Sequence, residues 1–287
     1  MNEITRREFL RLAAAGAAGA AACAFLPRPL FAALGDVAGA RQGDPAYAGF
    51  NMGLQTYTLR NFDLDTCLKQ LKDFGLKYAQ FYSGMMKQTT DAAQIASYKE
   101  KLAAAGVTIL SYGVQGFGKN HDQNKAQFEF AKAMGFKVYT ADPAPDSFES
   151  LDALTREYGM KIAIHNHGPG DKKYAKLEQV QKAVEKWPEA IGSCVDTGHV
   201  LRSGEDPVKW IQALGPRVHD VHIKDFSDAN TEHVLGQGKL DVLGVLKALK
   251  AVKFGGILAL EYEKNPKDPI ADIKACLEAV REGCRKL

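Results

Sequence analysis

The last β-rich run of the chain reads Gly256-Ile257-Leu258-Ala259-Leu260-Glu261, where four apolar residues lead directly into a carboxylate. A strand that is apolar on both faces is typical of a parallel sheet covered by helices, because neither face meets water. Seven similar runs precede it, at residues 53–59, 78–82, 108–114, 138–141, 161–165, 192–196 and 219–223. Helical patterns separate these runs, and the eight strand–helix units predict an α/β fold, a (β/α)8 TIM barrel.

Glycines punctuate this alternation in the expected places. Four of them fall where a helix should stop before the next strand begins: Gly75, Gly106, Gly135 and Gly159. The alternative fold is an open doubly wound sheet, which would carry a glycine-rich phosphate loop after its first strand. Residues 55–60 read Gln-Thr-Tyr-Thr-Leu-Arg and offer no such loop. The pattern therefore favours the barrel.

The first forty residues have the features of an export signal. Residues 5–10 read Thr-Arg-Arg-Glu-Phe-Leu, a twin-arginine motif, and a weakly apolar, Ala/Gly-rich stretch follows at 12–26. Ala38-Gly39-Ala40 offers a small-x-small cleavage site. We therefore predict a twin-arginine signal peptide at 1–40 and the barrel domain at 41–287. The alternatives are an ordinary N-terminal helix, or a lipid anchor on Cys23, which lacks the usual Leu three positions earlier.

The export signal and the net charge limit the kinds of partner that this protein is expected to meet. A twin-arginine signal predicts a periplasmic or extracellular protein that meets the twin-arginine translocase during export and keeps no stable membrane anchor. The net charge of +3 is too small to suggest a nucleic-acid surface. An exported protein would meet few of the phosphorylated metabolites that the cytoplasm holds. The sequence leaves the oligomeric state open, a homo-oligomer included.

Four successive strands end in residues that bind metal ions. The fifth to eighth runs reach His165, Asp196, His222 and Glu261 at their carboxyl ends. Active sites of such barrels lie at this end, so we expect the four side chains to form one ring. Two imidazoles and two carboxylates suit one divalent ion such as Mn²⁺, Zn²⁺, Co²⁺ or Fe²⁺, and are too rich in nitrogen for Ca²⁺.

Each of these residues also has a simpler interpretation. A histidine at the end of one strand is more often a hydrogen-bonded structural residue than a ligand. His219 begins its strand and is expected on the opposite face of the barrel, while His121 and His233 are expected in solvated loops. No cysteine pair has zinc-ligand spacing, so the thiols are expected to be free and buried. A purely structural role explains one such residue well, but it does not easily explain four potential metal ligands at the ends of four successive strands.

From Gly53 to its C-terminus the chain resembles the xylose-isomerase-like TIM barrels of the sugar phosphate isomerase/epimerase superfamily. The resemblance rests on motifs that occur in the family's order: Gly53-Leu54-Gln55-x-Tyr57-x-Leu59-Arg60, Val195-Asp196-Thr197-Gly198-His199, His222-Ile223-Lys224-Asp225, Gly236-Gln237-Gly238 and Leu260-Glu261-Tyr262-Glu263. It implies metal ligands at Asp196, His222 and Glu261, with His199 near the substrate.

The sequence departs from the ketose 3-epimerases of that family at one ligand. Those enzymes carry a glutamate where this chain has His165, and an arginine beyond the seventh-strand histidine where this chain has Asp228 nearby. A metal-bound imidazole cannot also act as a base, because its lone pair is committed. This chain therefore lacks one of the two carboxylates of that family's paired-glutamate proton shuttle.

The remaining catalytic candidates are Glu261, His167, His199 and Lys224. They suit removal of a proton next to a metal-polarised carbonyl. We therefore predict first a sugar isomerase or epimerase acting on a free keto- or aldo-sugar. The second prediction is a lyase that eliminates the aglycone from 3-keto-glycosides. A non-catalytic periplasmic sugar-binding protein is a third interpretation. A multi-zinc endonuclease that cuts abasic DNA would need further His and Glu ligands on earlier strands. The second to fourth strands offer few such residues, so this function is disfavoured.

Overall fold

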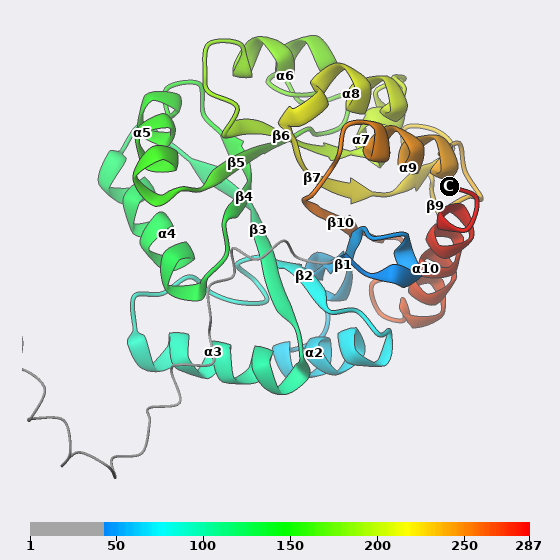
Figure 1. Ribbon diagram of the computed structural model, residues 1–287, viewed down its shortest axis with the longest axis horizontal. Coiled ribbons are helices and arrows are strands. Elements are labelled where there is room, and N and C mark those ends of the chain that lie inside the picture. The colour runs from blue at the N-terminus through cyan, green and yellow to red at the C-terminus, as the bar shows by residue number, and fades with distance from the viewer. Residues whose placement is uncertain (1–42) are drawn as a thin grey trace, which may run out of the picture. The chain divides into compact units, whose positions relative to one another are not determined.

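The computed structural model of this chain describes residues 43–287, and eight parallel strands in it close into a barrel surrounded by helices (Figure 1). The strand order around the barrel is β1-β10-β7-β6-β5-β4-β3-β2, so every strand neighbours the next barrel strand in the chain. The barrel strands are β1 (Asn51–Gln55), β2 (Tyr78–Phe81), β3 (Thr108–Phe117), β4 (Val138–Pro143), β5 (Lys161–His165), β6 (Ile191–Asp196), β7 (Val218–Ile223) and β10 (Ile257–Leu260). The predicted (β/α)8 TIM barrel is confirmed.

The helices form the outer ring. They are α2 (Leu64–Asp73), α3 (Ala92–Ala105), α4 (His121–Met134), α5 (Phe148–Tyr158), α6 (Leu177–Val184), α7 (Thr197–Arg202), α8 (Pro207–Leu214), α9 (Val242–Ala251) and α10 (Ile270–Cys284). Short 3₁₀ helices lie at η2 (Pro45–Tyr47), η3 (Thr56–Leu59) and η4 (Gly215–Arg217), and a small hairpin, β8 (Asp225–Phe226) with β9 (Glu232–His233), follows β7. Within residues 43–287, no helix combines the length and the apolar character needed to span a membrane.

Local signals in the sequence set the helix ends. Asp63 and Asp91 begin α2 and α3 by accepting a hydrogen bond from a backbone N–H of the first turn. At the other end, Gly106 and Gly135 adopt left-handed backbone with φ of 68° and 88°. A side chain at these positions would be strained, which explains why glycine ends each helix before the next strand.

The first strand differs from its prediction. The β-rich run at 53–59 contains only the end of β1, because residues 56–59 form the 3₁₀ helix η3. The Gln55 side chain accepts a hydrogen bond from the Tyr57 backbone N–H at 3.1 Å, which turns the chain out of the strand. The other predicted strands agree with the structure to within three residues at each end.

Strand register brings the polar strand ends together at one mouth of the barrel. Parallel pairing places Asp196 of β6 beside His222 of β7, and His222 beside Ala259 of β10. The apolar residues of β10 are all buried: Leu258 and Leu260 belong to the main core, and Ile257 and Ala259 form a smaller cluster with Leu110. The barrel therefore supplies a rigid frame whose carboxyl end carries the polar residues.

The cysteines of this part of the chain are buried free thiols, as predicted: Cys67, Cys194, Cys276 and Cys284. The predicted signal peptide and Cys23 lie outside the described residues.

Candidate metal centre

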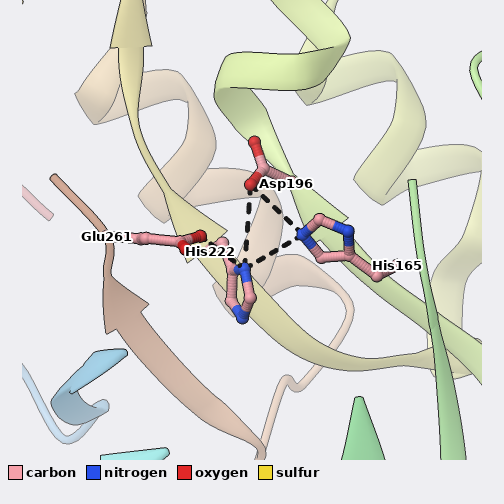
Figure 2. Close-up of side chains that lie close together, drawn as sticks. All are labelled: His165, Asp196, His222 and Glu261. Carbon is pink, nitrogen blue, oxygen red and sulfur yellow. Dashed lines mark hydrogen bonds and ion pairs between the residues drawn. The ribbon is translucent and has the colours of Figure 1, made fainter. Parts of the chain in front are cut away.

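The four predicted ligands lie together at the carboxyl end of the barrel (Figure 2). His165, Asp196 and His222 end or nearly end β5, β6 and β7, and Glu261 directly follows β10. One ligand atom of each lies within 4.8 Å of the others. The closest pairs are His222 Nδ1 with Glu261 Oε2 at 2.9 Å and with His165 Nε2 at 3.1 Å. Asp196 Oδ2 lies 3.4 Å from His165 Nε2 and 3.7 Å from His222 Nδ1.

These four side chains fit a divalent metal ion. Ligands that share one ion at about 2.0–2.2 Å lie roughly 3–3.5 Å from one another, close to the separations seen here. Asp196 Oδ2 and Glu261 Oε2 are buried without a hydrogen-bond partner among the described residues, although both point at the imidazole nitrogens. A cation between them would satisfy both oxygens. Nitrogen and carboxylate donors in equal number are typical of Zn²⁺, Mn²⁺, Co²⁺ or Fe²⁺.

Asp196 is held by the turn into α7. Its Oδ1 accepts the His199 backbone N–H at 2.8 Å as the N-cap of that helix, which leaves Oδ2 for the ring. The Asn166 side chain bonds both the backbone N–H and the backbone C=O of Asp196. Burial alone would raise the pKa of Asp196, but the Lys224 ammonium holds it well below the usual value. This carboxylate is therefore ionised and fixed.

The two ligand histidines differ in their surroundings. Burial lowers the pKa of His165 to about 3, so its imidazole is neutral at physiological pH and its lone pair is available. His222 Nε2 lies 2.6 Å from Gln80 Oε1 on β2, at the opposite edge of its ring from the metal ligands. The sequence analysis missed Gln80, because a single glutamine inside the apolar run 78–82 gives no signal of its own.

Lys224 is a buried cation beside the four candidate metal ligands. Its Nζ lies 2.5 Å from Glu263, 3.1 Å from Glu261 and 3.4 Å from Asp196. Burial lowers the pKa of Lys224, but the Asp196 and Glu261 carboxylates outweigh burial and raise it well above its usual value. For Glu261, burial alone would raise the pKa. The positive charges of Lys224 and His222 outweigh burial and lower the pKa of Glu261 well below its usual value. Glu263 was not predicted, although it lies two residues beyond Glu261.

A pocket of about 350 Å³ opens above these residues. Its polar lining includes all four predicted catalytic residues: His167, His199, Lys224 and Glu261. Of the other ligands only His165 lines the pocket, and Asp196 does not. Tyr57 and Tyr82 form an aromatic wall with ring centroids 5.2 Å apart, which the sequence analysis also missed. An aromatic face beside polar groups suits a polyhydroxylated ligand with apolar C–H faces.

His199 presents an N–H group to the pocket. Arg202 Nη1 lies 2.9 Å from His199 Nδ1, and a guanidinium can only donate, so Nδ1 is the acceptor. Burial lowers the pKa of His199, which keeps the ring neutral with its proton on Nε2. His167 is more exposed, and its ring lies 4.7 Å from that of His165. His167 follows β5 and His199 belongs to α7 after β6, whereas Lys224 follows β7.

The remaining histidines lie away from the centre. His219 Nε2–H donates to the Glu189 backbone oxygen at 2.7 Å. Glu189 precedes β6, so His219 lies at the opposite end of the barrel, as predicted. His121 and His233 are not in plain loops: His121 begins α4, and His233 belongs to β9 and contacts Ser227. The loop prediction was wrong for both, because neither has a strong periodic signal around it.

The Gly236-Gln237-Gly238 loop has a structural role. Buried Asp225 accepts backbone N–H groups of Gly236, Gly238 and Leu240, each at 2.8 Å. A Cβ on Gly238 would lie 2.3 Å from Asp225 Oδ1. The loop therefore needs glycine there to close over the carboxylate.

Comparison with known proteins agrees with this architecture. An inosose dehydratase of Lacticaseibacillus casei is 26% identical over 228 residues, 73% of this chain and 74% of that protein. Among solved structures, 3-keto-D-glucoside 4-epimerase of E. coli in its apo form is 14% identical with a TM-score of 0.67, covering 81% of this chain and 99% of that chain. The IOLI protein with a binding zinc atom is 18% identical with a TM-score of 0.67, covering 82% and 98%.

At such identities the two solved structures are similar to this chain in fold alone. The family described as xylose isomerase-like TIM barrel matches residues 68–282, a range that includes the four ligands and the four catalytic candidates. The chain belongs to the xylose isomerase-like TIM barrel family.

Proposed function

We propose that this protein is a metal-dependent lyase of the dehydratase type, acting on an unphosphorylated keto-sugar or keto-polyol. The observation that carries the proposal is the unlike character of the two flanks of the pocket. One flank, after β5 and β6, offers the imidazoles of His167 and His199, and the other, after β7, offers the buried ammonium of Lys224. Elimination uses a base at the carbon and an acid at the leaving oxygen, and two unlike groups in one pocket can divide these roles. The inosose dehydratase of Lacticaseibacillus casei supports the same reaction class.

The residues can be given roles. The divalent ion held by His165, Asp196, His222 and Glu261 would polarise a substrate carbonyl, as a Lewis acid does. His167 takes the proton from the carbon next to that carbonyl. His199 Nε2–H donates a hydrogen bond to the oxygen on which negative charge develops.

Lys224 completes the reaction from the other flank. Its ammonium gives a proton to the oxygen that leaves the neighbouring carbon, and the pair of electrons left by the C–H bond forms the new double bond. Water or an alcohol departs, depending on what the oxygen carries. A divalent cation close by would lower the pKa of Lys224 toward the range in which it can release its proton.

The isomerase or epimerase remains the second candidate, because it begins with the same proton removal. An epimerase that works on both faces of one carbon needs two groups that each accept and donate a proton. Glu261 is one such carboxylate at the pocket, but the matching position opposite holds His165, whose lone pair serves the metal. This asymmetry favours elimination.

The test is a reaction in D₂O with metal-loaded protein and a panel of keto-inositols, 3-keto-glycosides and ketoses, read by NMR. Release of water or aglycone with a new carbon–carbon double bond supports the lyase. Deuterium at carbon without bond cleavage on every substrate would refute it in favour of the epimerase. The Glu261→Gln variant should lose all metal-dependent turnover, whereas His121→Gln, on the outer surface, should retain it.

The roles of the two flanks can also be separated. In Lys224→Met, deuterium exchange should persist while elimination falls by about 10²–10⁴-fold, since only the acid is lost. In His167→Gln, both should fall together. Equal losses of exchange and elimination in Lys224→Met would exclude the ammonium as the acid.

A further inference from the structure

A chain of buried hydrogen bonds between side chains reaches His222 at its Nε2 edge. It runs from the backbone at the end of β1 through Gln55 and Gln80 to Asp220 on β7, and Gln80, Asp220 and His222 are all buried within the barrel. Gln55 is likewise buried, and it lines the floor of the pocket as well as contacting Gln80. The direction of every hydrogen bond can therefore be worked out from its neighbours.

The backbone fixes the orientation of Gln55. Its Oε1 accepts the Tyr57 backbone N–H at 3.1 Å, and its Nε2 donates to the Gly113 backbone oxygen at 3.0 Å. A backbone N–H only donates and a backbone C=O only accepts, so the side-chain amide has one orientation. The same Nε2 also donates to Gln80 Oε1.

The other end of the chain fixes Gln80 independently. Its Nε2 lies 3.1 Å from Asp220 Oδ2, 2.7 Å from Ser111 Oγ and 2.8 Å from Thr140 Oγ1. Thr140 itself donates to Asp220 Oδ2 at 2.8 Å. A reversed Gln80 amide would bring its oxygen against the Asp220 oxygen and its nitrogen against the donor nitrogen of Gln55. Both ends thus require the oxygen of Gln80 to face His222.

His222 must then donate its Nε2–H to Gln80 Oε1, 2.6 Å away. We infer that Gln80, oriented by Gln55 and Asp220, is a positioning residue that holds the His222 proton on Nε2 and directs the Nδ1 lone pair to the metal. The inference rests on the metal centre of the proposed function but on none of its reaction steps. Partners of this kind orient a ligand imidazole and raise its basicity, and their loss weakens metal binding by about 10–100-fold.

Two measurements test the proposal: the zinc affinity of variants, and the position of the proton on the His222 imidazole. Zinc dissociation constants, measured by competition with a chromophoric chelator, should rise by about 10–100-fold in Gln80→Leu. Ser193→Ala is the matched control, because Ser193 is a buried barrel hydroxyl that bonds the Ile164 backbone oxygen outside this chain of hydrogen bonds. The control should bind zinc like the wild type. A Gln80→Leu protein that is folded and binds zinc as tightly as the control would overturn the proposal.

Asp220 offers a second, milder pair of variants. Asp220→Asn keeps an oxygen that can accept from Gln80, so its zinc affinity should stay within about threefold of wild type, whereas Asp220→Leu should lose about tenfold or more. Equal affinities in the two variants would contradict the orienting role of Asp220.

The wild-type protein gives a readout that needs no variant. Long-range ¹H–¹⁵N spectra of the zinc-loaded protein should show His222 protonated at Nε2 and metal-bound at Nδ1. Zinc at Nε2 would overturn the proposal even if the variants do not fold. Zinc binding with the expected tautomer but no turnover would leave this inference intact and refute the proposed function, so the two can fail separately.

Discussion

Lys224→Met should make the protein depend on its metal for stability. Methionine keeps most of the length and packing of the lysine stem but removes an ammonium that lies 3.1 Å from Glu261 and 3.4 Å from Asp196. Both carboxylates are buried and held ionised, so they cannot turn to water for compensation. Removing one partner of a buried ion pair costs about 3–5 kcal/mol, because an uncompensated charge is left inside. We expect the metal-free variant to lose about that much free energy of unfolding.

A bound divalent cation should recover most of this loss, because it brings positive charge to the same two oxygens. The metal must then bind more tightly to the variant than to the wild type. Recovery of about 3 kcal/mol corresponds to a dissociation constant roughly 100-fold lower. The assay compares urea-induced unfolding in excess chelator with unfolding in saturating zinc, alongside a competitive zinc titration.

The control is Lys173→Met, which removes a partly exposed ion pair with Asp142 away from the ring. Partly exposed pairs contribute little, so this variant should lose less than about 1 kcal/mol with or without zinc. The reasoning is refuted if Lys224→Met is destabilised equally in chelator and in zinc, or if it binds zinc more weakly than the wild type.

Three further outcomes follow from the structure. Gly238→Ala should lower the free energy of unfolding by about 1–3 kcal/mol, because its Cβ would displace Asp225 from the loop; an unchanged urea midpoint would contradict that close contact. Burial raises the pKa of Glu232 to about 7, above its usual value of 4.5, so the folded state favours the protonated carboxyl. The stability that this preference contributes is fully present below pH 4.5 and is lost as the pH rises through 7. Glu232→Gln should thus be more stable than the wild type at pH 8 by about 3 kcal/mol and equal at pH 4, and parallel pH profiles of the urea midpoint would refute the raised pKa. Removing the metal with a chelator should lower the thermal midpoint of the wild type, as binding to the folded state alone requires.

The fold and the convergence of the four candidate ligands could be predicted because each depends on local patterns with a fixed geometric meaning. An apolar run such as 257–260 predicts a buried parallel strand, and its carboxyl end must lie at the catalytic mouth of a barrel. His165, Asp196, His222 and Glu261 each stand at such an end, so their convergence follows from topology alone. The glycines that end the helices were readable for the same reason, since left-handed backbone favours one residue type.

The surroundings of the ring could not be predicted, because they depend on which side chains meet across the barrel. Gln80 lies on β2 and meets His222 on β7, 142 residues later, and no local pattern links the two. One signal was present for Asp220: it stands two residues before His222 on the same strand, and alternate residues of a strand share a face. The Tyr57 wall was missed because η3 was interpreted as part of a strand.

The order of the two predicted reactions changes for a related reason. Sequence names the titratable residues near a strand end but not which of them border the pocket. In the structure Asp196 does not line the pocket. Lys224 does line it, and its ammonium forms ion pairs with Glu261 and Glu263. A symmetrical pair of carboxylates would have favoured proton transfer between two faces of one carbon. Imidazoles and an ammonium in one pocket favour removing a proton at one carbon and protonating the oxygen that leaves the next, which is elimination.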